Sequence, residues 1–76
     1  RKELNKFVNK LIEEGRVAIR NVRRDGIQNL HNFEKDGHVS MDIIKDNESE
    51  IQKITDDKIK ELNIMQEEKE KEILEV

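Results

Sequence analysis

The chain has 76 residues, of which 43% are charged and 33% hydrophobic, and its formal net charge is −3 at pH 7. A chain this short and polar holds at most one small domain, with a thin core and marginal stability. The absence of cysteine excludes disulfides and thiolate metal sites, and there is neither a signal-peptide core nor an apolar run long enough to span a membrane. We therefore expect a soluble, intracellular fragment of a longer protein, with no membrane partner.

The first predicted element is a helix over about residues 1–35. Its apolar and small residues recur at steps of three and four, which is the spacing of one helix face. These positions are Leu4, Val8, Leu11, Gly15, Ala18, Val22, Gly26 and Phe33, with the polar Asn29 in the same series, and Phe7, Ile12, Ile19 and Leu30 widen the stripe. At 1.5 Å per residue the helix is about 50 Å long. Its small residues indicate a second helix at close range; the alternative is that Gly26 merely weakens or kinks the helix.

The middle of this helix carries four arginines, Arg16, Arg20, Arg23 and Arg24. At the helical rotation per residue they fall within an arc of about 100°, and Ala18 and Val22 point the opposite way. The planar arginine fork grips phosphate oxygens at two points and stacks on bases, so the cluster indicates a structured RNA as partner. The alternative is that these arginines form surface ion pairs, for instance Arg16 with Glu13.

Residues 36–40 are predicted to form a turn. Gly37 can adopt the left-handed conformation that closes a helix. Ser40 is a good N-cap for a following helix, and Asp42 would lie in its positively polarised first turn.

The second predicted helix covers about residues 41–75, and its stripe is thinner and more broken than the first. The stripe comprises Ile44, Ile51, Thr55, Lys58, Leu62, Met65, Lys69, Ile73 and Val76, flanked by Ile54 and Ile59. A short turn between two long helices makes them antiparallel. The predicted fold class is therefore all-α, a single helical hairpin over residues 1–76.

The charge is distributed unevenly between the two halves. Residues 1–38 hold nine lysines and arginines against six acidic residues, whereas residues 39–76 hold six against twelve. A non-specific RNA-binding chain would be basic throughout. A basic stripe on an acidic body instead favours one oriented mode of docking.

Three segments resemble the ribosome recycling factor family, in register along the chain: RVAIRNVRRD at 16–25, QKITD at 52–56 and KEKEI at 69–73. The resemblance implies a translation factor that docks on large-subunit ribosomal RNA. With elongation factor G and GTP, it would split the post-termination ribosome and release mRNA. By residue match, RNA binding falls to Arg20 and Arg23 first, then to Arg16, Arg24 and Arg1. It also implies a bacterial cytoplasmic or an organellar location.

The resemblance further implies a three-helix bundle, of which this chain supplies the last two helices. With the other helix absent, we expect an apolar groove that a second copy fills to form a four-helix homodimer. We also expect the fragment to bind large subunits without recycling ribosomes alone.

The residues give no support for catalysis, a cofactor or a metal site. His31 and His38 lie on different elements without a suitably spaced acidic or thiol partner. Asp25, Thr55 and Asp56 are interpreted as structural. Two other functions stay open. A generic antiparallel coiled-coil oligomerisation module leaves the arginine cluster unexplained, and a membrane-surface helix is disfavoured by small residues on the apolar face and by the acidic second helix.

Overall fold

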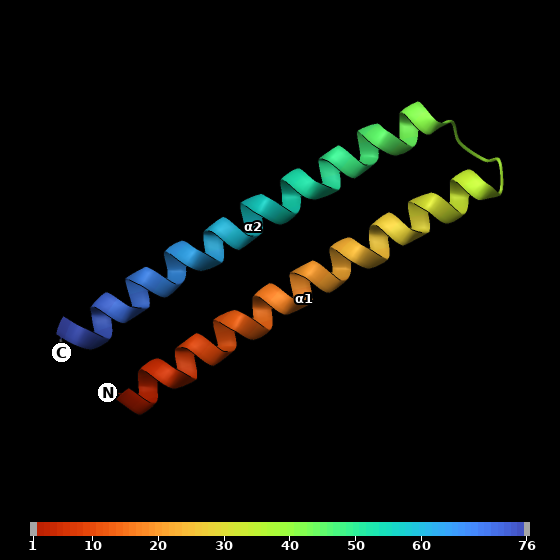
Figure 1. Cartoon of the computed structure of the whole chain (residues 1–76). Coiled ribbons are helices and arrows are strands. Elements are labelled where there is room, and N and C mark those ends of the chain that lie inside the picture. Colours follow the sequence, from red (N-terminus) through yellow and green to blue (C-terminus); the bar gives the residue numbers. More distant parts are fainter. Residues whose placement is uncertain (1, 76) are drawn as a thin grey trace.

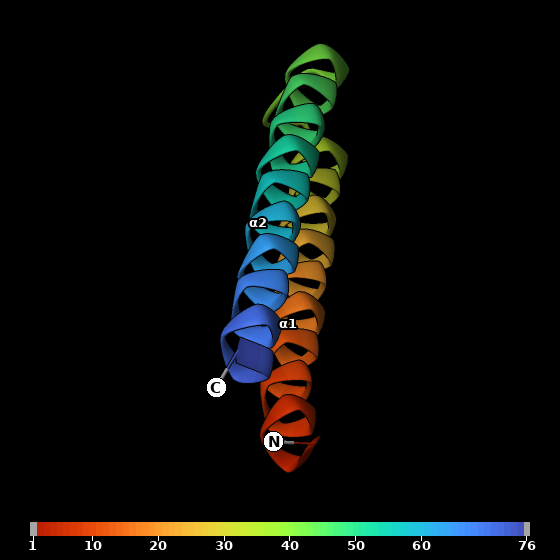
Figure 2. The same cartoon turned by 90° about the vertical axis from the view of Figure 1, so that its left-hand side faces the viewer.

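Two long antiparallel helices make up the structure (Figure 1). The computed structural model describes the backbone of residues 2–75 and the side chains of residues 2–73. Helix α1 spans Lys2–Lys35 and helix α2 spans Met41–Glu75. They run side by side in a body of 57 × 16 × 8 Å (Figure 2). The described chain is an all-α helical hairpin, which confirms the predicted fold class.

The end of α1 is closed by a glycine, as the sequence predicted. Gly37 has a φ of 75°, in the left-handed region that favours glycine. Its N–H donates to the Glu34 carbonyl at 2.9 Å, and the His38 N–H donates to the Phe33 carbonyl at 3.2 Å. This pair of bonds is a Schellman motif, and the Phe33 and His38 rings meet edge to face across it with centroids 6.4 Å apart.

The start of α2 is capped by Ser40, which is also as predicted. The Ser40 hydroxyl oxygen accepts a hydrogen bond from the Ile43 N–H at 3.4 Å, and its carbonyl accepts one from the Ile44 N–H at 3.1 Å. Asp42 lies in the first turn, where the helix dipole favours negative charge. The chain therefore reverses direction within five residues, and this fixes the register of the two helices.

The core between the helices is thin. Its buried side chains are Ile12, Ile44 and Thr55, with exposed fractions of 6%, 1% and 6%. The Thr55 hydroxyl donates to the Ile51 carbonyl one turn earlier, at 2.8 Å, which satisfies a polar group in apolar surroundings. The structural interpretation of Thr55 is confirmed.

Part of the apolar stripe of α1 packs against α2, and part of it is exposed to solvent. Val8, Gly15, Ile19, Gly26 and Leu30 are half-buried. Large apolar side chains on the stripe nevertheless stay exposed, namely Leu4, Phe7, Leu11, Val22 and Phe33. The stripe is wider than one neighbouring helix can cover, so an apolar face is left over. Over the described residues, neither helix contains a stretch long and apolar enough to cross a membrane.

Candidate nucleic-acid interface

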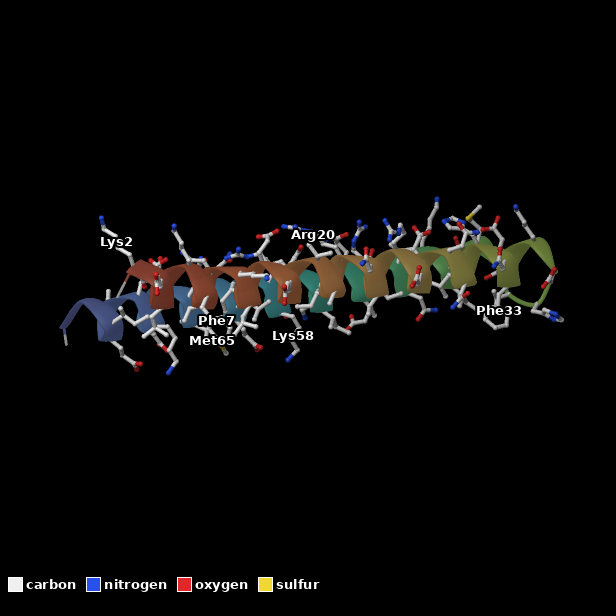
Figure 3. The ribbon with its side chains drawn as sticks, turned by 90° about the horizontal axis from the view of Figure 1, so that it is seen from below. Lys2, Phe7, Arg20, Phe33, Lys58 and Met65 are labelled. Atoms are coloured by element: carbon white, nitrogen blue, oxygen red, sulfur yellow. The ribbon has the colours of Figure 1, made fainter. Side chains whose placement is uncertain are left out.

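The arginine segment lies at the middle of α1, and Arg20 projects away from the exposed apolar face. Figure 3 shows Arg20 projecting from one side of the hairpin and Phe7, Lys58 and Met65 projecting from the other. In a straight helix, residues three and four positions apart lie on the same face, so the Arg20 side and the opposite side stay distinct along the hairpin. The fifth predicted RNA-binding arginine, Arg1, lies outside the described residues.

Arg16 is held by the hairpin itself. Its Nε donates to Asn63 Oδ1 at 3.0 Å, its Nη1 donates to Glu13 Oε2 at 2.9 Å, and its Nη2 donates to Gln66 Oε1. All three guanidinium nitrogens are therefore engaged, and the side chain is only 16% exposed. Arg16 ties α1 to α2, and it can grip a phosphate only by releasing acceptors on its own chain.

The other described arginines are less constrained. Arg20 is 53% exposed, and its Nη1 lies 3.8 Å from Glu13 Oε1, an ion pair that is too long for a hydrogen bond. Arg24 is exposed, and its Nη2 donates to Asn21 Oδ1 at 2.7 Å. Arg23 is half-exposed and makes no hydrogen bond or ion pair within the described part of the chain. Arg20, Arg23 and Arg24 thus retain donors that an incoming phosphate can use.

The polar contacts that hold Arg16 extend across the hairpin. The Gln66 Nε2 donates to Asn9 Oδ1 at 2.8 Å, so Asn9, Gln66, Arg16 and Asn63 form one cross-helix network. Sequence reasoning did not identify Asn9, Asn63 or Gln66 as partners. One signal was available, because Gln66 follows Leu62 by four residues and so places an amide on the packed stripe of α2.

An open apolar groove of about 400 Å³ runs between the helices near their middle. It is lined by Ala18, Ile19, Val22, Arg23, Gly26, Ile51, Ile54, Thr55 and Lys58. Most of this lining is apolar, as expected from the sequence for the groove beside these helices, and its occupation by a second copy stays a prediction.

Asp25 was expected to make a structural contact, but it is exposed and has no hydrogen bond or ion pair to any described residue.

His31 joins the two helices near the turn. Its Nε2 lies 2.7 Å from Glu48 Oε1 on α2, and its Nδ1 lies 3.7 Å from Glu34 Oε2. Glu34 Oε2 is buried and accepts no hydrogen bond from any described residue. Among the side chains of residues 2–73, no group of three histidine or acidic residues is placed to hold a metal ion. The contact of His31 with Glu48 links α1 to α2 near the turn.

Comparison with known protein families shows to which family this chain belongs. The family model described as "Ribosome recycling factor" matches residues 1–74. The chain belongs to the ribosome recycling factor family. The predicted resemblance is confirmed, and the arginine segment and the apolar groove are features of a ribosome recycling factor chain.

Relatives within the ribosome recycling factor family come from bacteria and chloroplasts. The ribosome-recycling factor of Prochlorococcus marinus strain AS9601 is 53% identical over 76 residues, which is 100% of this chain and 42% of the relative. That of Desulfatibacillum aliphaticivorans is 45% identical over 75 residues, 99% of this chain and 40% of the relative. The chloroplastic factor of Oryza sativa subsp. indica is 46% identical over 76 residues, 100% of this chain and 29% of the relative.

The chain thus spans less than half the length of these ribosome recycling factors. No solved structure gives a significant match to it.

Proposed function

We propose that this chain is the RNA-docking part of a ribosome recycling factor. It binds large-subunit ribosomal RNA through Arg20 and Arg23, assisted by Arg24. The observation that carries the proposal is the exposed position of Arg20 on one side of a straight helix, with Arg23 and Arg24 in the next turn, in a chain that belongs to this family. Arg16 contributes mainly by tying this helix to α2.

Electrostatics supports one oriented mode of docking. Phosphate contacts supply affinity and salt dependence but carry little sequence information, so selectivity comes from the shape of the folded RNA. The acidic half of the chain forms α2, which repels phosphate. RNA is therefore drawn to the arginine side of α1 and away from the rest of the surface.

In the whole protein, the proposed activity is the splitting of the post-termination ribosome with elongation factor G and GTP, which frees mRNA. The factor supplies no catalytic chemistry; its rigid helices act as a wedge while the partner hydrolyses GTP. Since the chain spans 42% of its Prochlorococcus relative, we propose that docking belongs to this part and that splitting requires the remainder. Relatives from bacteria and chloroplasts support action in a bacterial cytoplasm or in an organelle.

We also propose that a second copy of the chain covers the apolar groove when no other helix does. Four helices would then enclose side chains such as Val22, Ile54 and Met65, which are 72%, 50% and 47% exposed in one copy. This homodimer is the one proposed here for the isolated chain. Arg20 projects from the other side of the hairpin and stays on the outer surface of the dimer, whereas Arg23 lies at the groove.

Co-sedimentation with large ribosomal subunits tests the docking proposal. The double variant Arg20→Glu, Arg23→Glu replaces two donors with repelling charges, and we expect it to lose binding at least tenfold. The matched control is Lys53→Glu, Lys58→Glu, which makes the same charge change at exposed positions of α2. Lys58 projects from the side opposite Arg20 (Figure 3).

We expect this control variant to bind within about threefold of the unmodified chain, and binding of that chain to weaken as salt is raised. Equal binding by the two double variants, with helix content preserved, would contradict the proposal.

A further inference from the structure

The carboxylate of Glu13 lies between two arginines that have different surroundings. Its Oε2 accepts a hydrogen bond from Arg16 Nη1 at 2.9 Å, and its Oε1 lies 3.8 Å from Arg20 Nη1. Arg16 is 16% exposed, whereas Arg20 is 53% exposed. Glu13 therefore faces a largely buried, hydrogen-bonded arginine with one oxygen and an accessible arginine with the other.

The network on α2 determines where the Glu13 carboxylate lies. Asn63 and Gln66 fix the guanidinium of Arg16 from the opposite helix, and Arg16 in turn orients Glu13. The carboxylate therefore cannot turn away from Arg20 without breaking its hydrogen bond with Arg16. Such an arrangement keeps a negative charge beside Arg20 whether or not an anion is present.

We propose that Glu13 is a positioning residue that restrains Arg20 and competes with phosphate for it. This inference rests on the proposed RNA docking, because it concerns how Glu13 controls phosphate binding by Arg20, one of the arginines proposed to bind RNA. A phosphate that approaches Arg20 on the side facing Glu13 must displace this ion pair and meets the repulsion of the carboxylate. Glu13 thereby lowers the affinity of Arg20 for anions in general. It favours a phosphate that binds Arg20 on the side away from Glu13.

Glu14 offers a matched control. It is adjacent to Glu13, carries the same carboxylate group and is also exposed. It has no ion pair or hydrogen bond within residues 2–73. Changing either glutamate to glutamine removes one negative charge and keeps a good helix former. Only Glu13→Gln removes the charge that faces Arg20.

The first test uses inorganic pyrophosphate as the probe and the side-chain NMR signals of arginine as the readout. We expect the Arg20 signal in Glu13→Gln to reach half-saturation at a pyrophosphate concentration about two- to fivefold lower than in the unmodified chain. The change is small because an exposed ion pair contributes little free energy. In Glu14→Gln it should titrate as in the unmodified chain, and Arg16 should respond last. Identical titrations for the two glutamine variants would overturn the inference, as would an Arg16 response at the same concentration as that of Arg20.

The second test measures affinity for large ribosomal subunits. Glu13→Gln should bind about two- to fivefold more tightly than Glu14→Gln, and this difference should vanish when Arg20 is also changed to Gln. A difference that persists without Arg20 would overturn the inference. Failure of every chain to bind subunits, combined with the expected pyrophosphate response, would instead refute the docking proposal and support the role of Glu13.

Discussion

At the scale of single residues, Arg16 and Arg20 show how one turn of helix separates two roles. They are four residues apart on the same face, yet Arg16 reaches Asn63 and Gln66 on α2 while Arg20 projects into solvent. The alternative of a surface ion pair is therefore confirmed for Arg16, and RNA binding by the other arginines stays a prediction. Arg16 forms an ion pair with Glu13, and its neighbours Arg20, Arg23 and Arg24 carry the proposed RNA contact.

Two glycines of α1 differ in how closely α2 approaches them. A Cβ added at Gly15 would lie 3.3 Å from Leu62 Cδ1, whereas one at Gly26 would lie 3.5 Å from Ile51 Cδ1, an ordinary van der Waals distance. Replacing glycine with alanine in a helix gains about 1 kcal/mol of propensity. At Gly15 part of that gain is offset because Leu62 must move.

We therefore predict that Gly26→Ala stabilises the chain by up to about 1 kcal/mol and that Gly15→Ala has a smaller effect. For a domain of this size, 1 kcal/mol corresponds to a shift of the thermal midpoint of about 4–8 °C. Thermal unfolding followed by circular dichroism measures both variants at one protein concentration. A larger stabilisation from Gly15→Ala than from Gly26→Ala would contradict this reading of the contacts.

At the scale of elements, the sequence predicted the features that depend on local chemistry. Helix periodicity, the left-handed Gly37 and the Ser40 cap all act within a few residues, so they are visible without a tertiary structure. The separation of Arg20 from the apolar side likewise follows from helical geometry alone.

Features that depend on the register between α1 and α2 could not be predicted in the same way. The capture of Arg16 by Asn63 and Gln66 joins residues 47 and 50 positions apart, and no local pattern specifies that pairing. The division of the α1 stripe into a packed and an exposed part also depends on where α2 lies.

At the scale of the whole molecule, we expect the two faces of the hairpin to respond oppositely to salt. The exposed apolar side is bordered by acidic residues that lie three or four positions from exposed apolar residues on the same helix. These are Glu14, Asp25, Asp57, Glu61 and Glu68, all of them exposed. Two copies that meet through this face bring acidic borders together, so screening should favour the dimer.

We therefore predict a concentration-dependent monomer–dimer equilibrium that shifts towards dimer as salt is raised, while binding to ribosomal subunits weakens. Analytical ultracentrifugation at several salt concentrations measures the dimer. Val22→Glu places a charge on a side chain that is 72% exposed on the apolar side and should shift the equilibrium to monomer. A monomer at all concentrations and salt conditions would contradict the homodimer proposal and leave the docking proposal intact.

The most direct test of the central claim maps which RNA lies beside the arginines. The chain has no cysteine, so a single introduced cysteine gives a unique attachment point for a tethered iron chelate that cleaves nearby RNA. Val17→Cys places the chelate on α1 beside the arginines, at a residue that is 46% exposed, and Lys58→Cys places it on the opposite side (Figure 3). We predict localised cleavage of large-subunit ribosomal RNA from position 17 and much weaker cleavage from position 58. Equal cleavage from both positions, or cleavage only from position 58, would contradict docking through the arginine face.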